Sequence, residues 1–128
     1  MCRIAVIEDH ADIRELLTLV LESVAGYEVI VFSDPTQVVP RLAAGEAFDL
    51  IISDITMPNM TGIEFVRYVR NKLQQTTLPI IAASAHLLDA TQDATIEAGF
   101  DAYVTKPINI ANLLTIVAKY VNKQDLAA

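Results

Sequence analysis

The sequence predicts a single α/β domain built on an open sheet of five parallel strands, with helices on both faces. Two observations carry this prediction. Five short apolar runs recur along the chain, and stretches with helical periodicity fill most of the gaps between them. Strands that alternate with helices pair in parallel through right-handed crossovers, which places the helices against the two faces of the sheet.

The five apolar runs are the predicted strands. They read IAVI, VIVF, LIIS, PIIAA and AYV, at residues 4–7, 29–32, 50–53, 79–83 and 102–104. The third run consists of large or β-branched apolar residues, which is typical of a strand buried on both faces. Pro58 and Asn59 follow it and prevent the strand from continuing. The sequence LIISDITMPNM therefore places a carboxylate, Asp54, where a buried strand ends.

Three gaps carry apolar residues at the i, i+3, i+4, i+7 spacing of an amphipathic helix. The sets are Ile13, Leu16, Leu17, Val20, Leu21 and Val24; Ile63, Val66, Val69 and Leu73; and Ile110, Leu113, Leu114, Val117, Ala118 and Val121. Each set is predicted to face the sheet. Asn109 is expected to cap the last helix.

The second and fourth helices are less regular. Asp34 and Pro35 have the pattern of an N-cap and a first helical position, but Pro40 follows five residues later. The second helix therefore either starts late, with Pro40 in its first turn, or kinks there. The fourth, at about residues 88–98, offers mainly Ile96 and the alanines at 90, 94 and 98 to the core, so we expect it to be the most loosely packed.

Composition narrows the class of protein. The chain has 128 residues, 53% hydrophobic and 20% charged, which predicts one packed domain over 1–128, with a core at 3–122 and a short tail at 123–128. No apolar stretch approaches the roughly 20 residues of a membrane span, and the N-terminus lacks a signal-peptide pattern. A single cysteine, Cys2, fits a reducing cytoplasm. The net charge of −7, without a Lys/Arg cluster, argues against nucleic-acid binding.

Polar side chains gather at one predicted edge of the sheet. In an open parallel sheet, ligands bind beyond the carboxyl ends of the strands. Four of the five strands end in such groups: Glu8 and Asp9, Asp54, Ser84, and Lys106. Three carboxylates close together repel one another and need a cation, and their oxygen atoms suit Mg²⁺. Asp54 ends the central strand and is the best nucleophile for an acyl phosphate, with Lys106 and Ser84 placed to contact phosphoryl oxygens.

The segments VIEDH, ISDITMPNMTG, AASAH and AYVTKPI together resemble the receiver domain of bacterial two-component response regulators. Each motif alone is weak, and the resemblance rests on their joint order and spacing from Ile4 to Val121. It implies a flavodoxin-like, doubly wound fold with strand order 2-1-3-4-5. It also implies phosphorylation of Asp54 with Mg²⁺ or Mn²⁺ as the metal.

The resemblance further implies a role for individual residues. Metal ligands would be Asp9, Asp54 and the backbone carbonyl of Thr56, with Glu8 acting through water. Lys106 would contact the phosphoryl group and precede a cis peptide to Pro107. Ser84 would be the switch hydroxyl and Tyr103 its aromatic partner, although Tyr103 could equally be a half-buried strand residue. His10 and His86 flank the site and are expected to be surface residues, and no second histidine or cysteine has the spacing of a zinc site.

The function implied is that of a phosphorylated signalling domain, not an enzyme with its own substrate. The donor would be a histidine kinase or a histidine phosphotransfer protein, and the output would be docking of a downstream protein on the face of the fourth helix, fifth strand and fifth helix. An acidic stripe of Asp89, Asp93 and Glu97 on that face is either a solvated helix surface or a site for a basic partner.

No effector domain is expected after Val121. The chain would therefore act as a stand-alone regulator, a phosphorelay intermediate, or a receiver cut from a hybrid histidine kinase.

Two other classes share part of this pattern. A haloacid-dehalogenase-like, Mg²⁺-dependent aspartyl phosphohydrolase would need a second Asp two residues after the first, where this chain has Thr56. A flavodoxin-like cofactor binder would need a phosphate-binding loop after the first strand. Glu8 and Asp9 stand there and would repel a phosphate in the absence of metal.

Overall fold

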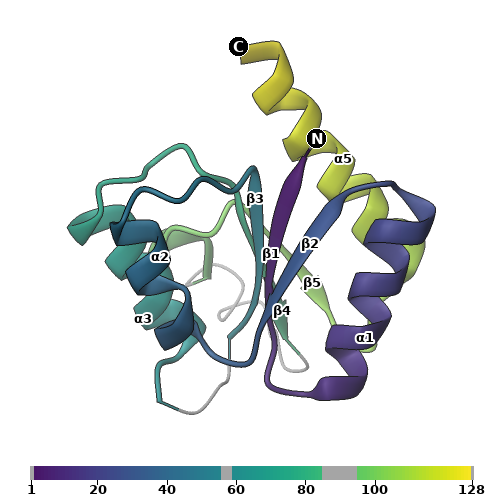
Figure 1. Ribbon diagram of the computed structural model, residues 1–128, viewed down its shortest axis with the longest axis horizontal. Coiled ribbons are helices and arrows are strands. Elements are labelled where there is room, and N and C mark those ends of the chain that lie inside the picture. Colours follow the sequence, from purple (N-terminus) through teal and green to yellow (C-terminus); the bar gives the residue numbers. More distant parts are fainter. Residues whose placement is uncertain (1, 56–58, 85–94, 128) are drawn as a thin grey trace.

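A computed structural model describes residues 2–55, 59–84 and 95–127 of the chain, with side chains described as far as residue 121. Its centre is a five-stranded parallel sheet in the order β2-β1-β3-β4-β5 (Figure 1). The strands are β1 (Arg3–Ile7), β2 (Glu28–Phe32), β3 (Leu50–Asp54), β4 (Ile80–Ser84) and β5 (Ala102–Thr105). The predicted fold class and strand order are confirmed.

Helices cover both faces of the sheet. One face packs against α1 (Ala11–Leu19), its π-helical continuation η1 (Val20–Val24), and α5 (Ile110–Ala127). The other packs against the short η2 (Pro35–Gln37) and α2 (Val39–Ala43), and against α3 (Gly62–Arg67) with its continuation η3 (Tyr68–Lys72). Figure 1 shows the two groups on opposite sides of the strands. None of the helices among the described residues is long and apolar enough to cross a membrane.

Alternation along the strands supplies two separate cores. In β1, Ile4 and Val6 face α1 and α5, whereas Ala5 and Ile7 face α2 and α3. All five residues of β3 are buried, and so are all five of β4. The strands β1 and β4 pair with the two edges of β3, and helices cover both of its faces. Asp54, at the end of β3, is therefore held on a rigid strand.

The irregular second helix begins late. The Asp34 side chain caps η2 by accepting from the Thr36 backbone N–H at 2.7 Å, and Pro40 lies in the first turn of α2. At the other end of the chain, the Asn109 side chain accepts from the Asn112 N–H at 2.9 Å, so the predicted N-cap of the last helix is confirmed.

The predicted buried face of the first helix is wrong at two positions. Leu17 and Leu21 are buried, but Leu16 at the margin of the stripe is 43% exposed and Val24 is 68% exposed. The chain widens in η1, where the Ala25 N–H donates to the Val20 carbonyl five residues earlier, and this turns Val24 away from the sheet.

The fourth helix is described only over residues 95–98, and the alanines predicted at 90 and 94 lie outside the described residues. Ala98 is buried as predicted. Ile96 was expected in the core and is 44% exposed. The inward position of this turn is taken by Thr95, which is fully buried.

Candidate functional site

The carboxyl ends of the strands bring the predicted polar residues to one edge of the sheet. Asp54 is the last residue of β3, and Glu8 follows β1, which pairs with β3 in parallel. Ser84 is the last residue of β4, and its backbone carbonyl accepts from the Lys106 N–H at 2.9 Å, just beyond β5. The structure thus places Glu8, Asp54 and Lys106 side by side although they are far apart in sequence.

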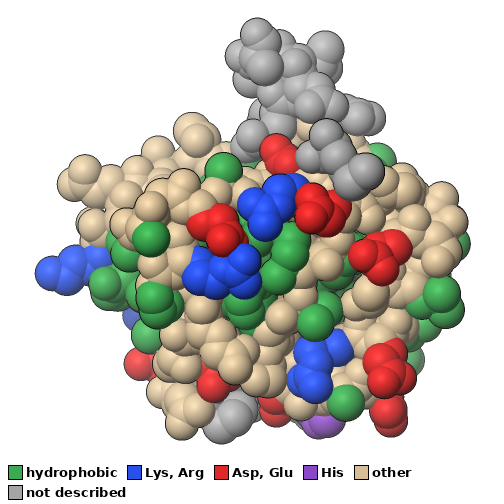
Figure 2. All heavy atoms as spheres, in the orientation of Figure 1, with side chains coloured by type: hydrophobic (Ala, Val, Ile, Leu, Met, Phe, Trp, Pro, Cys, Tyr) green, Lys and Arg blue, Asp and Glu red, His purple; other side chains and the backbone are tan. Residues whose placement is uncertain are grey.

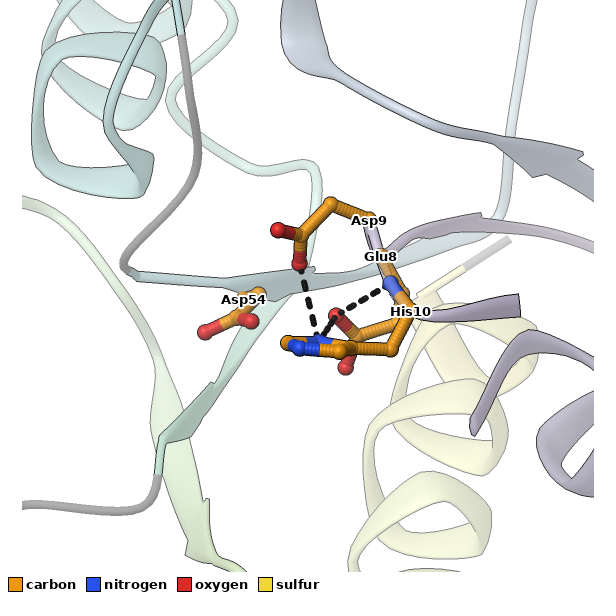
Figure 3. Close-up of side chains that lie close together, drawn as sticks. All are labelled: Glu8, Asp9, His10 and Asp54. Atoms are coloured by element: carbon orange, nitrogen blue, oxygen red, sulfur yellow. Dashed lines mark hydrogen bonds and ion pairs between the residues drawn. The ribbon is translucent and has the colours of Figure 1, made fainter. Parts of the chain in front are cut away.

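Carboxylates from two strands form an acidic cluster at this edge. Ligand atoms of Glu8, Asp9, His10 and Asp54 all lie within 4.8 Å of one another (Figure 3). Glu8 is 2% exposed and Asp54 is 5% exposed, so both are held away from bulk water. Like charges at such distances raise the energy of the ionised cluster unless a cation offsets them.

Lys106 supplies part of that compensation. Its Nζ donates to Glu8 Oε1 at 2.5 Å and to Asp54 Oδ2 at 3.0 Å, with only 13% of the side chain exposed. Burial alone would lower the pKa of Lys106, but the hydrogen bonds to Glu8 and Asp54 outweigh it and raise the pKa above its ordinary value. The lysine is therefore a fixed cation that is already directed at the Asp54 carboxylate.

The ionised form of Glu8 remains destabilised in spite of its contact with Lys106. Burial raises the pKa of Glu8, the hydrogen bond from Lys106 lowers it, and the nearby Asp9 and Asp54 carboxylates raise it again, so the net shift is upward. Lys106 pairs with two of the three carboxylates, Glu8 and Asp54, and has no ion pair with Asp9 among the described contacts. The described side chains do not neutralise the cluster.

Asp9 shows where further positive charge would fit. Its Oδ1 atom is buried and accepts no hydrogen bond from the described residues. His10 Nδ1 lies 3.2 Å away, but this contact lacks the geometry of a hydrogen bond. A buried oxygen without a donor, beside two more carboxylates, is a fitting environment for a divalent cation with hard oxygen ligands such as Mg²⁺ or Mn²⁺.

His10 belongs to this cluster, which the sequence analysis missed. Its side chain is 66% exposed, as expected for a surface histidine, yet its Nδ1 also lies 3.4 Å from Glu8 Oε2. The available signal was its position, immediately after the acidic pair and at the N-cap of α1. A side chain there lies over the same sheet edge as the carboxylates.

The remaining predicted residues are placed less closely. Ser84 is 6% exposed at the end of β4, one position beyond Ala83, the β4 partner of Asp54. Tyr103 is half-buried on β5 and packs against the core on the side of α3. Thr56, predicted to offer a backbone carbonyl, lies outside the described residues, as does His86. The predicted cis peptide between Lys106 and Pro107 is present.

A glycine allows α3 to begin directly behind the site. The Gly62 N–H donates to the Ile55 carbonyl at 2.8 Å. A Cβ at Gly62 would lie 2.9 Å from Ile55 Cα and would overlap the Asp54 carbonyl oxygen. Both are backbone atoms that cannot move aside, so only glycine permits this approach, which supports the backbone of Asp54 from behind.

Comparisons with known proteins agree with this architecture. The family model described as response regulator receiver domain matches residues 4–118. Among curated relatives, an uncharacterised 14.6 kDa protein of Leptolyngbya boryana is 32% identical, over 91% of this chain and 88% of that protein. A probable transcriptional regulatory protein of Picosynechococcus is 34% identical (88% and 46%), and the sensor kinase/phosphatase CqsS of Vibrio cholerae is 32% identical (93% and 17%). The chain thus spans most of the first relative and less than half of the other two.

Solved structures give the same result. The chemotaxis response regulator CheY4 of Vibrio cholerae is 31% identical with a TM-score of 0.84, covering 94% of this chain and 98% of that one. The receiver domain of the sensor histidine kinase PA1611 of Pseudomonas aeruginosa is 28% identical with a TM-score of 0.83 and the same coverage, and it has a magnesium ion coordinated in its active-site cleft. The resemblance predicted from the sequence is confirmed, and the phosphohydrolase alternative is not favoured. The chain belongs to the response regulator receiver domain family, whose members are phosphoacceptor signalling domains of two-component and phosphorelay systems.

Proposed function

We propose that Asp54 is the phosphoacceptor of this domain and receives its phosphoryl group from a phosphohistidine of a histidine kinase or histidine phosphotransfer protein. One observation carries the proposal. The Asp54 carboxylate ends a fully buried central strand, with Lys106 Nζ 3.0 Å from Oδ2 and the Glu8 and Asp9 carboxylates beside it. A nucleophile held this rigidly, next to a fixed cation, is suited to in-line phosphoryl transfer.

In the proposed reaction, an oxygen of the Asp54 carboxylate attacks phosphorus. The P–N bond of the donor breaks, its electron pair returns to the donor imidazole, and Asp54 becomes an acyl phosphate. Lys106 needs little reorganisation, because Glu8 already holds its ammonium group at the edge where phosphoryl oxygens would arrive. A divalent cation bound by Asp9, Asp54 and the Thr56 carbonyl, with Glu8 acting through water, would neutralise charge on the phosphoryl oxygens.

The proposed output is a change in docking on the face formed by the fourth helix, of which residues 95–98 are described, together with β5 and α5. The Lys106 N–H donates to the Ser84 carbonyl, so the two residues that would contact the phosphoryl group are joined through the backbone. Movement of the Ser84 hydroxyl toward a phosphoryl oxygen would make space for Tyr103 to turn inward from β5. A downstream protein would then recognise the altered face. Glu97 is exposed there, whereas Asp89 and Asp93 lie outside the described residues.

The test is site mapping with a small phosphodonor. The protein is incubated with acetyl phosphate and Mg²⁺, and the modified residue is identified by mass spectrometry after the acyl phosphate has been trapped by reduction. Asp54→Asn should abolish incorporation. Asp49→Asn, at the opposite edge of the sheet, should label at the rate of the wild type. Full labelling of the Asp54→Asn protein would falsify the assignment.

The switch is tested separately by amide hydrogen exchange with and without beryllium fluoride and Mg²⁺. Protection should change across residues 84 to 106. If protection changes only elsewhere, the proposed output face is wrong even if Asp54 is the acceptor.

A further inference from the structure

His10 gives the acidic cluster a nitrogen atom that its carboxylates do not supply. The Nδ1 atom lies 3.2 Å from Asp9 Oδ1 and 3.4 Å from Glu8 Oε2. In Figure 3 dashed lines join the imidazole ring to both of these carboxylates, and Asp54 lies to one side of the group. Ordinary hydrogen bonding explains this arrangement poorly, because the Asp9 contact lacks the required geometry and the Glu8 contact is long.

The same distances fit atoms that share one metal ion. For bonds of about 2.1 Å, adjacent ligand atoms are separated by about 3.0 Å in octahedral and about 3.4 Å in tetrahedral coordination. The separations of Nδ1 from the two carboxylate oxygens fall within or at the end of this range. Rotation of the exposed His10 side chain would let one ion contact Nδ1 and Asp9 Oδ1, with Glu8 Oε2 acting through water.

The backbone holds the imidazole in place. His10 is the N-cap of α1, and its carbonyl accepts from the Arg14 N–H at 3.1 Å. Its own N–H donates to Glu8 Oε2 at 3.3 Å. The Arg14 guanidinium donates to the Glu8 carbonyl at 2.7 Å and ties the same turn to the end of β1. The backbone of His10 is therefore fixed beside the cluster, and only the side-chain torsions have to be set when an ion binds.

We propose that His10 is an additional metal ligand, and that it gives this receiver domain a preference for divalent first-row transition ions, such as Mn²⁺, Co²⁺, Ni²⁺ and Zn²⁺, over Mg²⁺. An imidazole nitrogen suits these ions, whereas Mg²⁺ prefers oxygen ligands and keeps its waters. The inference rests on the proposed metal site and concerns which ions that site selects.

The experiment is calorimetric titration with Ni²⁺ and, separately, with Mg²⁺. All proteins carry Cys2→Ser, so that the partly buried Cys2 thiol cannot bind Ni²⁺. The starting protein should bind Ni²⁺ at least tenfold more tightly than Mg²⁺. His10→Ala should weaken Ni²⁺ binding about tenfold or more and change Mg²⁺ affinity less than about threefold.

Two further variants separate the ligand role from other effects. His10→Asn places a favoured N-cap residue before α1, so it should also lose the preference for Ni²⁺ while it folds and binds Mg²⁺ normally. His86→Ala removes the only other histidine of the chain and should change neither affinity. In NMR spectra, diamagnetic Zn²⁺ should shift the Nδ1 resonance of His10.

The outcomes distinguish this inference from the proposed function. Unchanged Ni²⁺ affinity in both His10 variants, or loss of Ni²⁺ binding in His86→Ala, overturns the role of His10 and leaves the Mg²⁺ site intact. Unchanged affinity for both ions in Asp9→Asn overturns the metal site itself.

Discussion

The carboxylates at the two ends of the β-sheet differ in how far hydrogen-bond donors and cations compensate their charge. At the amino-terminal edge, Asp49 precedes β3 and accepts from the Arg3 backbone N–H at 2.7 Å. Asp101 precedes β5 and accepts from the Ile80 N–H at 2.8 Å. Each aspartate thus binds the first residue of the neighbouring strand. Each carboxylate thus accepts a hydrogen bond from a backbone N–H, of Arg3 or Ile80, at the start of a neighbouring strand.

Asp101 also completes an ion pair. The Arg70 guanidinium donates to Asp101 Oδ2 at 2.9 Å, to the Gly99 carbonyl at 3.0 Å and to the Gln75 carbonyl at 2.7 Å. Burial lowers the pKa of Arg70, and the nearby Asp101 carboxylate partly restores it. Positive and negative groups therefore compensate each other at this edge.

The carboxyl edge has an excess of negative charge instead. Glu8 and Asp54 share Lys106, and Asp9 Oδ1 is buried without a hydrogen-bond donor among the described residues. Figure 2 shows acidic and basic side chains next to each other over one face of the molecule. The comparison teaches that one end of the sheet is optimised for stability, while the other retains repulsion that a bound cation or phosphoryl group can relieve.

Removal of Lys106 should have the largest effect on stability. Lys106→Met leaves Glu8 and Asp54 without their shared cation, and we expect a loss of about 3 kcal/mol in the free energy of unfolding near neutral pH. Lys72→Met, at an exposed lysine, is the matched control. Denaturant unfolding gives both values, and equal losses would show that Lys106 does not stabilise the edge.

The loss in Lys106→Met should also depend on pH. The pKa of Glu8 is already raised above 4.5, and removal of Lys106 takes away the hydrogen bond that lowers it. The contribution of a carboxyl group with a raised pKa is fully present below 4.5 and is lost as pH rises through the folded-state value. The defect should therefore be smaller at about pH 5 than at about pH 8. A defect that grows toward acid would contradict this reading.

Loss of the Asp101 contacts at the amino-terminal edge should have the next largest effect on the free energy of unfolding. Asp101→Ala removes the acceptor for the Ile80 N–H and the partner of Arg70, and should cost about 2 kcal/mol of the free energy of unfolding. Glu15→Ala, on the exposed side of α1, should change it by less than about 0.5 kcal/mol. An Asp101→Ala protein as stable as the wild type would show that this edge is not closed by its ion pair.

Addition of Mg²⁺ should stabilise the molecule through the carboxyl edge alone. At about ten times the dissociation constant, one bound ion adds about 1.4 kcal/mol to the free energy of unfolding. Asp9→Asn should lose this increment, whereas Asp101→Asn should keep it. Thermal unfolding with Mg²⁺ or with EDTA measures both, and an equal increment in Asp9→Asn would remove Asp9 from the metal site.

The smallest expected effect has the most informative sign. Without metal, Asp9→Asn removes one charge from the repulsive cluster and should stabilise the protein by about 1 kcal/mol. Asp49→Asn weakens the hydrogen bond from the Arg3 N–H and should destabilise it. The same substitution thus gives opposite signs at the two edges. Destabilisation in both would mean that the contrast between them is only apparent.

The sequence was sufficient to predict the sheet and most of its functional edge. Apolar runs mark strands because a buried parallel strand admits little else, and the residue that follows each run must lie at one edge of the sheet. Glu8, Asp54 and Lys106 could be placed in this way. The roles of these residues, and of Ser84, Tyr103 and Thr56, stay predictions.

Helix faces and local contacts were harder to predict. A periodicity of 3.6 residues assumes a regular helix, and the π-helical turn of η1 rotates Val24 out of the predicted face. His10 was predicted to be a surface residue, which its exposure confirms, but its contact with the carboxylates depends on a side-chain direction. The aspartates before β3 and β5 have no motif, because their partners are backbone groups of distant strands.

The lysine contact has a consequence for the order of assembly. Lys106 lies 98 residues from Glu8 and 52 residues from Asp54 along the chain. Closing a loop of this length costs chain entropy before the contact is gained. During synthesis, both carboxylates leave the ribosome before the lysine that offsets them. The acidic edge is therefore complete only once β5 has docked beside β4, and a chain that ends before residue 106 would keep the repulsion without its internal cation.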